Sequence, residues 1–533
     1  MRGATLLIMP AIRRRAVIVG FLALFAAFAI IAAACSGDDD GDDPRPTASP
    51  GTETQPPTDD VFSPGDPSGI TGADPDFDFV AMTWQGYWLS RDHFGPFVMQ
   101  SGMGITFEPP MEMLQAAMAM VAQNPDDPPF IPQNLAPLQV VYASGDPSAI
   151  HDLTQIAPDD FSAFRFDPDT FDTTVEVAAM AQTMLKESQW ARNFSSSHFG
   201  DPDGDFGAQQ RFMGVMVSLL AQMQGRYAVE NLRGLDGLYV DSDGELDLQG
   251  NWVLLHAFAD LVGLTIDESS RYYDPEAAGE WQTAANELFV ALSDSEVQGA
   301  IEATSAIRAA VYYAWTTPDA DERAKGLDKA CELADGLLRV SPASTVEKAA
   351  GIWGLVQVGE IEGDSEYLNA AVALFNDLQS DFDSEHGVFN SISTYTADDV
   401  AWLLSGLSAM SQRGPEAQRG PASEMLIAFF ESTMDLSGLQ LSAPPGKNGA
   451  MAGEWEKALP SVVYYHGADT PPPPAAGGTF GKAPVPASAI EWDGAEWTVT
   501  NDQFTTAWAM HLANELNWLV PHLGSVPFPP ISR

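Results

Sequence analysis

Cysteine and basic residues are both scarce in this 533-residue chain. Cys35 and Cys331 are the only cysteines, and Cys331 shares a predicted helix face with Leu327 and Ala334, which predicts a buried small apolar residue rather than a nucleophile. Lysine and arginine total 25 against 74 acidic residues, for a net charge of −49 at pH 7. Proteins that bind nucleic acid or anionic lipid need a basic surface. We therefore expect no nucleic-acid partner.

Several short catalytic motifs are also missing. The chain has no CxxCH, CxxC, HExxH or GxSxG sequence and no glycine-rich phosphate loop. These absences disfavour the enzyme classes that depend on such motifs, although catalysis by scattered residues remains open. The excess acid has two interpretations that are compatible with each other: a solvated acidic surface, or carboxylates that bind a divalent cation.

The N-terminus contains what the rest of the chain lacks, a long apolar run. Arg2 and three arginines at 13–15 precede 19 apolar residues, 16–34, which end in three alanines before Cys35. A basic flank, an apolar stretch and small residues are typical of a secretory signal peptide. The small residues before Cys35 resemble the lipobox of bacterial lipoproteins. That resemblance implies a signal peptide over 1–34, lipidation of Cys35, and an exported protein anchored to the extracytoplasmic side of a membrane.

Two alternatives to the lipoprotein interpretation stay open. The run is long enough for a retained transmembrane anchor, and an ordinary signal peptide could be cut at the alanines without modifying Cys35. The following segment, 35–75, begins with aspartates at 38–40 and 42–43 and continues with Pro, Thr, Ser and Gly. Such a segment is too polar to bury a core. It predicts a disordered tether, and with a lipid on Cys35 the chain could form no intramolecular disulfide.

Amphipathic helix dominates the remainder of the chain. In one example, Ile307, Val311 and Trp315 recur at four-residue spacing, as they would on one helix face. In another, Ser344 and Glu347 form a capping-box sequence. The pattern predicts an all-α fold of about twelve helices near 111–122, 173–190, 208–232, 251–263, 276–293, 297–316, 320–338, 344–359, 365–379, 397–412, 417–434 and 503–519.

The arrangement of these helices is indicated by one loop region. No repeat of fixed length is visible, which disfavours a tetratricopeptide array. Residues 380–389, followed by 395–399 at a helix start, resemble the inter-helix loops of (α/α)6-toroid proteins. The resemblance covers roughly residues 173–520. It implies a closed ring of helical hairpins, a fold that many carbohydrate-active epimerases, hydrolases and lyases share, although fold alone does not decide function.

Two regions interrupt the helical pattern. Residues 76–110 are rich in Trp, Tyr and Phe with Gly and Pro between them, and we expect an aromatic cap, so that 76–172 comprise this cap and the first helix. Residues 173–533 form the helical domain, with an insertion over 440–500. Within it, Asp493 and Gly494 separate two aromatic-flanked extended runs, which predicts a β-hairpin.

Acidic loops are the candidate metal sites. Alternating carboxylates around a glycine can wrap calcium, which binds six to eight oxygens, but Asp and Gly are also the commonest turn residues. Neither loop continues to the glutamate of an EF-hand. A plain turn is the favoured interpretation and calcium the alternative for two sets: Asp201, Asp203 and Asp205, then Asp241, Asp243, Glu245 and Asp247.

Candidate catalytic residues follow from the toroid resemblance, which implies acid–base groups at a mouth of the ring. Those chosen by loop position are His386, Tyr395, Asp398 and Asp399, and after them His198 and His93. The adjacent aspartates are also ordinary helix-start residues. His511 and Glu515 would share a helix face as a hydrogen-bonded or solvated pair, and His256 sits in an apolar run that predicts a satisfied core histidine.

Tryptophans are the candidate ligand-stacking residues, because an indole offers a flat apolar face with a polar edge. We single out Trp84, Trp88 and Trp402, with Trp190 as a further candidate, although most tryptophans pack in cores. Two functions remain in view. One is an exported, lipid-anchored protein that binds or processes a polysaccharide or oligosaccharide at a mouth of the ring. The other is a non-catalytic scaffold or partner-binding lipoprotein, with calcium as the one cofactor considered for either.

Overall fold

A computed structural model describes residues 77–94, 104–107, 138–148, 167–195, 205–441, 485–519 and 526–531. All of them belong to one compact unit, Asp59–Arg533. The predicted signal peptide, Cys35, the tether and the helix expected near 111–122 lie outside the described residues. No helix within the described ranges is long and apolar enough to cross a membrane.

The fold is mostly helical, as predicted. The helices in the described part are α2 (Phe79–Phe94), α4 (Val177–Ser195), α5 (Asp205–Asn231), α6 (Leu248–Ile266), α7 (Pro275–Ser293), α8 (Gly299–Thr316), α9 (Ala320–Arg339), α10 (Thr345–Glu362), α11 (Ser365–Asp381), α12 (Ala397–Arg413), α13 (Glu416–Phe430) and α15 (Thr506–Trp518). A short 3-10 helix, Pro168–Thr170, precedes α4, and a π-helix, Glu431–Leu436, extends α13.

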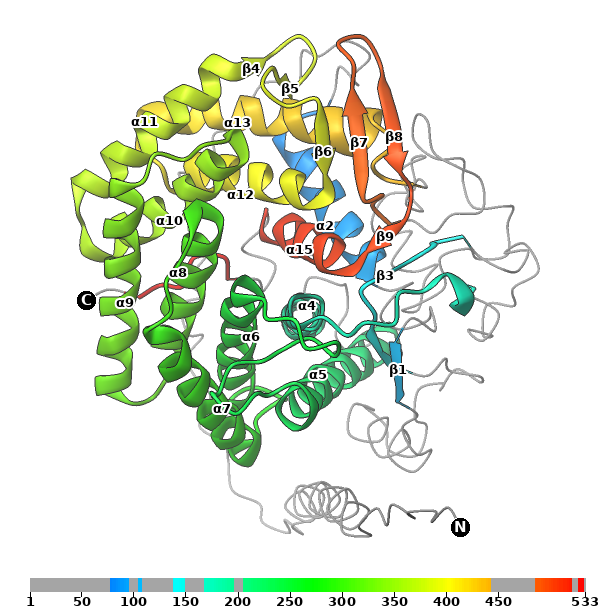
Figure 1. The fold of residues 1–533 in the computed structure, drawn as a ribbon, viewed down its shortest axis with the longest axis vertical. Coiled ribbons are helices and arrows are strands. Elements are labelled where there is room, and N and C mark those ends of the chain that lie inside the picture. The colour runs from blue at the N-terminus through cyan, green and yellow to red at the C-terminus, as the bar shows by residue number, and fades with distance from the viewer. Residues whose placement is uncertain are drawn as a thin grey trace, which may run out of the picture. The chain divides into compact units, whose positions relative to one another are not determined.

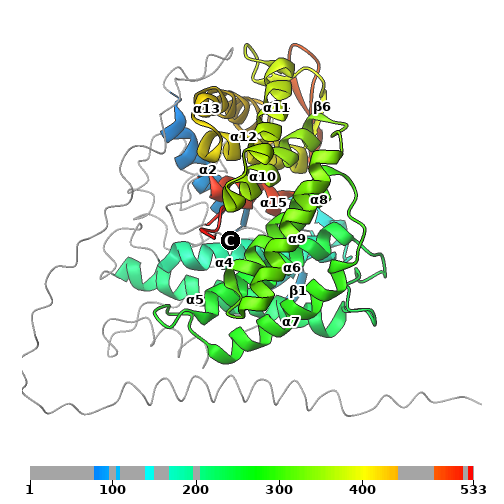
Figure 2. The same cartoon turned by 90° about the vertical axis from the view of Figure 1, so that its left-hand side faces the viewer.

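Six of these helices form a closed inner ring. Going round it, α4 packs on α6, α6 on α8, α8 on α10, α10 on α12, α12 on α15, and α15 returns to α4 (Figure 1). Each inner helix has an outer partner: α5 on α4, α7 on α6, α9 on α8, α11 on α10, α13 on α12, and α2 on α15. The α8–α9 and α10–α11 pairs stand side by side in Figure 2. This arrangement is an (α/α)6 toroid, which confirms the predicted fold class.

The last pair joins the two ends of the described chain. Helix α2 comes early in the sequence and α15 late, yet they pack together and complete the sixth hairpin. The aromatic composition of 76–110 predicts a cap, but Phe79–Phe94 is helical. The reason lies in the spacing of Phe79, Met82, Gly86, Leu89 and His93, which places one buried face along the helix. The abundance of other aromatics in the segment conceals this periodicity.

Caps and turns predicted from sequence place the helix starts. Ser344 and Glu347 form the expected capping box at the start of α10. Thr396 and Asp399 form a second capping box at α12. Because the helices alternate between the inner and outer layers, the inner helices all begin at one end of the ring, which we call the N-terminal mouth. The backbone conformation near α12 and α15 is fixed at this mouth by short strands.

The strands are few and short. They are β1 (Gly104–Phe107), β2 (Leu138–Val141), β3 (Ser144–Gly145), β4 (Phe382–Asp383), β5 (Val388–Phe389), β6 (Thr394–Thr396), β7 (Ala489–Trp492), β8 (Trp497–Asn501) and β9 (Phe504–Thr505). The pairs β1–β2, β3–β9 and β4–β5 are antiparallel, and β7 lies between β6 and β8. The predicted hairpin is confirmed: Trp492 pairs with Trp497, and Gly494 turns the chain with φ of 98°.

Candidate functional site

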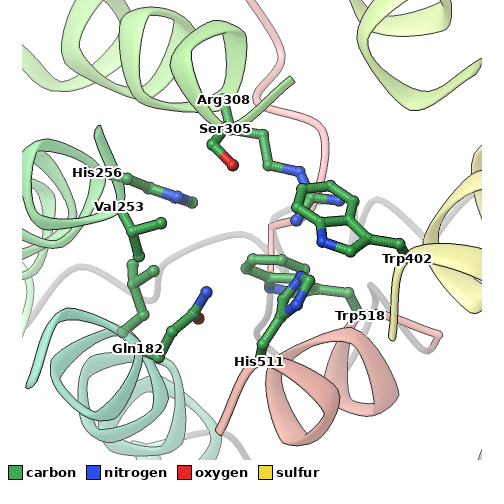
Figure 3. Close-up of a pocket in the computed structure, with 9 residues that line it drawn as sticks. Gln182, Val253, His256, Ser305, Arg308, Trp402, His511 and Trp518 are labelled. Carbon is green, nitrogen blue, oxygen red and sulfur yellow. The ribbon is translucent and has the colours of Figure 1, made fainter. Parts of the chain in front are cut away.

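A small cavity lies inside the ring, among five of the inner helices. Its volume is about 10 Å³, the room that about one water molecule needs. The side chains around it are buried, and Figure 3 shows how they converge. They are Gln182 and Leu185 from α4, Val253 and His256 from α6, Ser305 and Arg308 from α8, Trp402 from α12, and His511 and Trp518 from α15. We call this set the ring centre.

Arg308 links three inner helices at the ring centre. Its Nη1 forms an ion pair with Glu515 of α15, and its Nη2 donates a hydrogen bond to the hydroxyl of Ser405 on α12. Both charged side chains are buried, with 6% and 4% exposed. A buried charge is tolerated only when it is paired and hydrogen-bonded. The ion pair therefore links α8 to α15, and the hydrogen bond to Ser405 links α8 to α12.

Aromatic rings surround the same guanidinium. Its central carbon lies 4.3 Å from the ring centroid of Trp353, 5.0 Å from that of Trp402 and 5.3 Å from that of Trp518. At these distances the cation is attracted to the negative faces of the indoles. The guanidinium is thus held rigidly beside the cavity by three tryptophans in addition to its ion pair.

His511 is held between two carboxylates. Its Nδ1 lies 2.7 Å from Oδ1 of Asp398, and its Nε2 lies 3.3 Å from Oε1 of Glu515. Burial lowers the pKa of His511, but the two carboxylates outweigh that effect and leave its pKa raised. Burial likewise raises the pKa of Glu515, but Arg308 and His511 outweigh it and leave that pKa lowered. The arrangement favours an imidazolium at position 511.

His256, in contrast, favours the neutral imidazole. Burial, with the positive charges of Arg308 and Arg192, brings its pKa well below the ordinary value. Its ring packs 3.9 Å from that of Tyr312 by centroid, and its buried Nε2 has no hydrogen-bond partner in the described residues. Two histidines with opposed proton preferences therefore face one cavity, the arrangement in which one group can act as acid and the other as base.

The C-terminal segment, residues 526–531, packs behind this site. The Tyr312 hydroxyl donates a hydrogen bond to the carbonyl of Val526, and Phe528 stacks on Trp353 with 5.3 Å between centroids. Tyr312 in turn supports His256, and Trp353 supports Arg308. This segment therefore packs against the two aromatic residues that contact His256 and Arg308.

The candidate catalytic residues occupy different places. His386 bonds to Asp383, 2.9 Å away, and packs against Trp492 near the β7–β8 hairpin. Tyr395 is fully buried, and its hydroxyl bonds to the backbone of Phe389. Neither lines the cavity. His93 is buried and bonded to the side-chain oxygen of Gln440, 2.7 Å from its Nε2, and His198 lies outside the described residues.

The adjacent residues Asp398 and Asp399 make different contacts. Asp399 accepts the capping bonds of Thr396. Asp398 instead contacts His511, and its side chain remains 25% exposed. Of the four residues that the sequence placed first for catalysis, Asp398 is the one that touches the ring centre. It does so through His511 rather than by lining the cavity.

Of the candidate stacking residues, Trp402 lines the cavity. Trp84 and Trp88 lie on α2, on the outer layer, and their side chains are outside the described part of the structure. Trp190 is fully buried and packs against Tyr87 with 5.1 Å between centroids. One of the candidates therefore meets the site.

The acidic loops are built as turns where the structure describes them. Oδ1 of Asp241 accepts from the Val177 amide at 2.7 Å, and Oδ1 of Asp243 accepts from the Glu245 amide at 3.2 Å. Asp247 is the N-cap residue of α6. Asp201 and Asp203 lie outside the described residues, and Asp205 is the first residue of α5. Within the described ranges, no three or more His, Cys, Asp or Glu side chains are grouped to hold a metal ion.

The sequence did not reveal Arg308, Trp518 or Gln182 as site residues, and it placed His256 in the core as a satisfied group. Burial of His256 is confirmed, but its Nε2 lacks a partner in the described residues. One feature of the sequence indicates the site: His256 and Arg308 are polar residues inside long apolar helices. It points to a common centre only once the order of the helices around the ring is known.

No protein-family model and no curated protein matches the chain. Solved structures to which the chain is similar include a sugar epimerase from a ruminal bacterium, at 9% identity and a TM-score of 0.39 over 64% of this chain and 87% of that one. Cellobiose 2-epimerase from Bacillus thermoamylovorans is similar at 10% identity and a TM-score of 0.41, over 71% of this chain and 92% of that one.

A third structure is unsaturated glucuronyl hydrolase from Bacillus sp. GL1, at 12% identity and a TM-score of 0.36, over 66% of this chain and 97% of that one. We transfer no activity or residue role from any of the three.

Proposed function

We propose that the ring centre is a saccharide-binding site. The observation that carries the proposal is the convergence of two histidines, an arginine and two tryptophans on a cavity inside a closed ring of helices. Saccharides combine apolar ring faces with polar edges, and they are bound by aromatic faces together with a few convergent polar groups. Trp402 and Trp518 supply the aromatic surface, while His256, His511 and Arg308 supply the polar groups.

The size of the cavity defines how a saccharide would be placed. About 10 Å³ admits one polar group of a ligand rather than a whole sugar ring. The remainder of the ligand would lie toward the N-terminal mouth, where Asp398 is partly exposed at the start of α12. The ring centre would thus bind one end group of the saccharide.

Proton transfer is the chemistry that this site could supply. His511, with its raised pKa, would serve as a general acid toward the bound end group through Nε2, which makes no hydrogen bond within the described residues, and neutral His256 would serve as a general base toward a proton at a neighbouring position of the ligand. Asp398 and Glu515 would keep His511 protonated and oriented through its two ring nitrogens. Arg308 would balance negative charge that develops on the ligand.

The same proposal places the protein outside the cytoplasm. The apolar run before Cys35 and the polar tether after it support an exported protein whose lipidated Cys35 anchors the helical body to a membrane. Mass spectrometry of the mature N-terminus tests this part: a diacylglyceryl mass on Cys35 is expected, and an unmodified N-terminus would contradict it.

Thermal melting with saccharides tests the binding site. A ligand that binds only the folded state raises the melting temperature by mass action. We expect a shift with at least one member of a panel of monosaccharides and oligosaccharides. His256→Gln should abolish the shift because His256 lines the cavity. The matched control, His386→Gln, should retain it, because His386 lies away from the cavity beside Trp492.

A second candidate function is a non-catalytic scaffold. It is favoured by the small volume of the cavity and by the Arg308–Glu515 pair, which together leave the ring interior largely filled by side chains. If no saccharide shifts the melting temperature, this function replaces the first. Capture of partner proteins by the full-length anchored chain would then be the informative measurement.

A further inference from the structure

Around the cavity, unpaired hydrogen-bond donors outnumber unpaired acceptors. Three N–H groups around the cavity have neither a hydrogen-bond acceptor nor an ion-pair contact of their own within the described residues: Nε1 of Trp402, Nε1 of Trp518 and Nε of Arg308. All three residues line the cavity and are at least 95% buried, with exposures of 2%, 5% and 5%. A buried donor left without a partner costs free energy. Something that accepts hydrogen bonds would therefore stabilise this site.

The lining side chains offer fewer free acceptors than free donors. Oε1 of Gln182 accepts from the Asn514 amide group at 2.9 Å. The Ser305 hydroxyl donates its hydrogen to the carbonyl of Ile301 at 3.1 Å, and its oxygen can still accept. Oε1 of Glu515, behind the cavity, is shared by Arg308 and His511. The wall thus offers donors to an incoming group and has few free acceptors for its hydrogens.

We infer that the ligand group that enters the ring centre is an oxygen that only accepts hydrogen bonds, that of a carbonyl or a carboxylate. This inference rests on the proposed function, because it specifies which end group the bound saccharide carries. A hydroxyl brings a hydrogen that needs an acceptor, and an ammonium brings three and no lone pair. His256 Nε2 accepts or donates according to its tautomer, and as an acceptor it would offset one of the three donors, so donors remain in excess.

Charge does not by itself separate the two kinds of oxygen. Arg308 is paired with Glu515, and protonated His511 is paired with Asp398. The fixed charges at the ring centre therefore cancel, so a neutral carbonyl and a carboxylate share the same recognition by N–H donors. The two sources of this oxygen are distinguished by experiment.

Calorimetric titration of the full chain with two matched pairs of sugars provides the test. Glucuronate and glucose differ by a carboxylate in place of a hydroxymethyl group. N-acetylglucosamine and glucosamine differ by an amide carbonyl in place of an ammonium. We expect the acceptor-bearing member of at least one pair to bind about tenfold more tightly. The pair that shows the preference identifies the oxygen as that of a carboxylate or of a carbonyl.

Variants locate the preference at the ring centre. Trp402→Phe removes one N–H and keeps an aromatic face, so it should reduce the preference several-fold. Trp281→Phe is the matched control. Its indole N–H is also buried and without a partner in the described residues, but it lies on the outer helix α7 and does not line the cavity. We expect this control to leave the preference unchanged.

The outcomes separate the inference from the proposed function. Equal binding within both pairs, or tighter binding of glucose or glucosamine, overturns the inference and leaves saccharide binding in place. Equal losses of preference in Trp402→Phe and Trp281→Phe also overturn it. If none of the four sugars binds but an oligosaccharide shifts the melting temperature, the end group is not an acceptor oxygen of these classes. If no saccharide binds at all, the proposed function fails and the inference fails with it.

Discussion

Inner helix α8 and outer helix α9 are neighbours of similar length with very different surroundings. Almost every residue of α8 is buried, including Arg308. Helix α9 buries a single stripe, of which Leu327, Ala330, Ala334 and Leu337 are part, and leaves the remaining residues exposed or half-buried. A polar side chain on α9 can be hydrated, whereas one on α8 must find a partner inside the protein. Polar residues of the inner ring therefore carry structural and functional information that those of the outer ring do not.

The largest expected contrast is between two ion pairs. Arg308→Met leaves Glu515 buried without its cation, and we expect a loss of about 3–5 kcal/mol of unfolding free energy. Arg226→Met breaks the exposed pair with Glu280, which joins α5 and α7, and should cost about 0–1 kcal/mol. Urea denaturation of both variants measures the difference. Equal losses would contradict the distinction between inner and outer layers.

Two glycines give the next contrast. A Cβ at Gly406 on α12 would overlap the carbonyl oxygen of Ala349 on α10, so Gly406→Ala should cost about 1–3 kcal/mol. Gly279 on α7 is exposed with open space around it among the described residues. Gly279→Ala should stabilise the protein by about 0.5–1 kcal/mol through helix propensity. Opposite shifts in melting temperature are expected. A neutral Gly406→Ala would show that α10 and α12 pack less closely than described.

The smallest expected effect is a dependence on pH. The pKa of His511 is higher in the folded state than its ordinary value of about 6.5. The stability contributed by its carboxylate partners is therefore fully present below pH 6.5 and is lost as pH rises through the folded-state pKa. Asp398→Asn should destabilise the protein most at low pH, with a difference from wild type that shrinks as pH rises.

The control for this measurement is Asp383→Asn, which removes the partner of His386. That pair is part-exposed, with 30% of each side chain accessible, so solvent screens it. Its effect on unfolding should be small across the range. A constant difference between wild type and Asp398→Asn at every pH would show that Asp398 does not act through the charge of His511.

The sequence predicted local structure well where the signal is local. The capping box at Ser344, the hairpin at Asp493 and Gly494, and the helical pattern that includes Ile307 and Val311 all depend on residues close together in the chain. Their physical causes are a hydrogen bond, a turn conformation and an apolar stripe. Each can be recognised without knowing the rest of the fold.

The site could not be predicted in the same way. Arg308 and Glu515 are 207 residues apart, and their contact exists only because α15 closes the ring between α12 and α4. His511 and Asp398 are brought together by the same closure. Sequence reasoning chose His386 and Tyr395 from loop positions, whereas the polar groups that converge lie in the middle of buried helices. Knowledge of the helix order would be needed to combine them.

A crystal structure of the protein soaked with N-acetylglucosamine, and separately with glucuronate, tests the central claim most directly. The account predicts that one of them places an oxygen within hydrogen-bond distance of Nε1 of Trp402 and Nε1 of Trp518, beside Arg308. Ligand density confined to the rim near His386 and Trp492, with the ring centre unchanged, would contradict it.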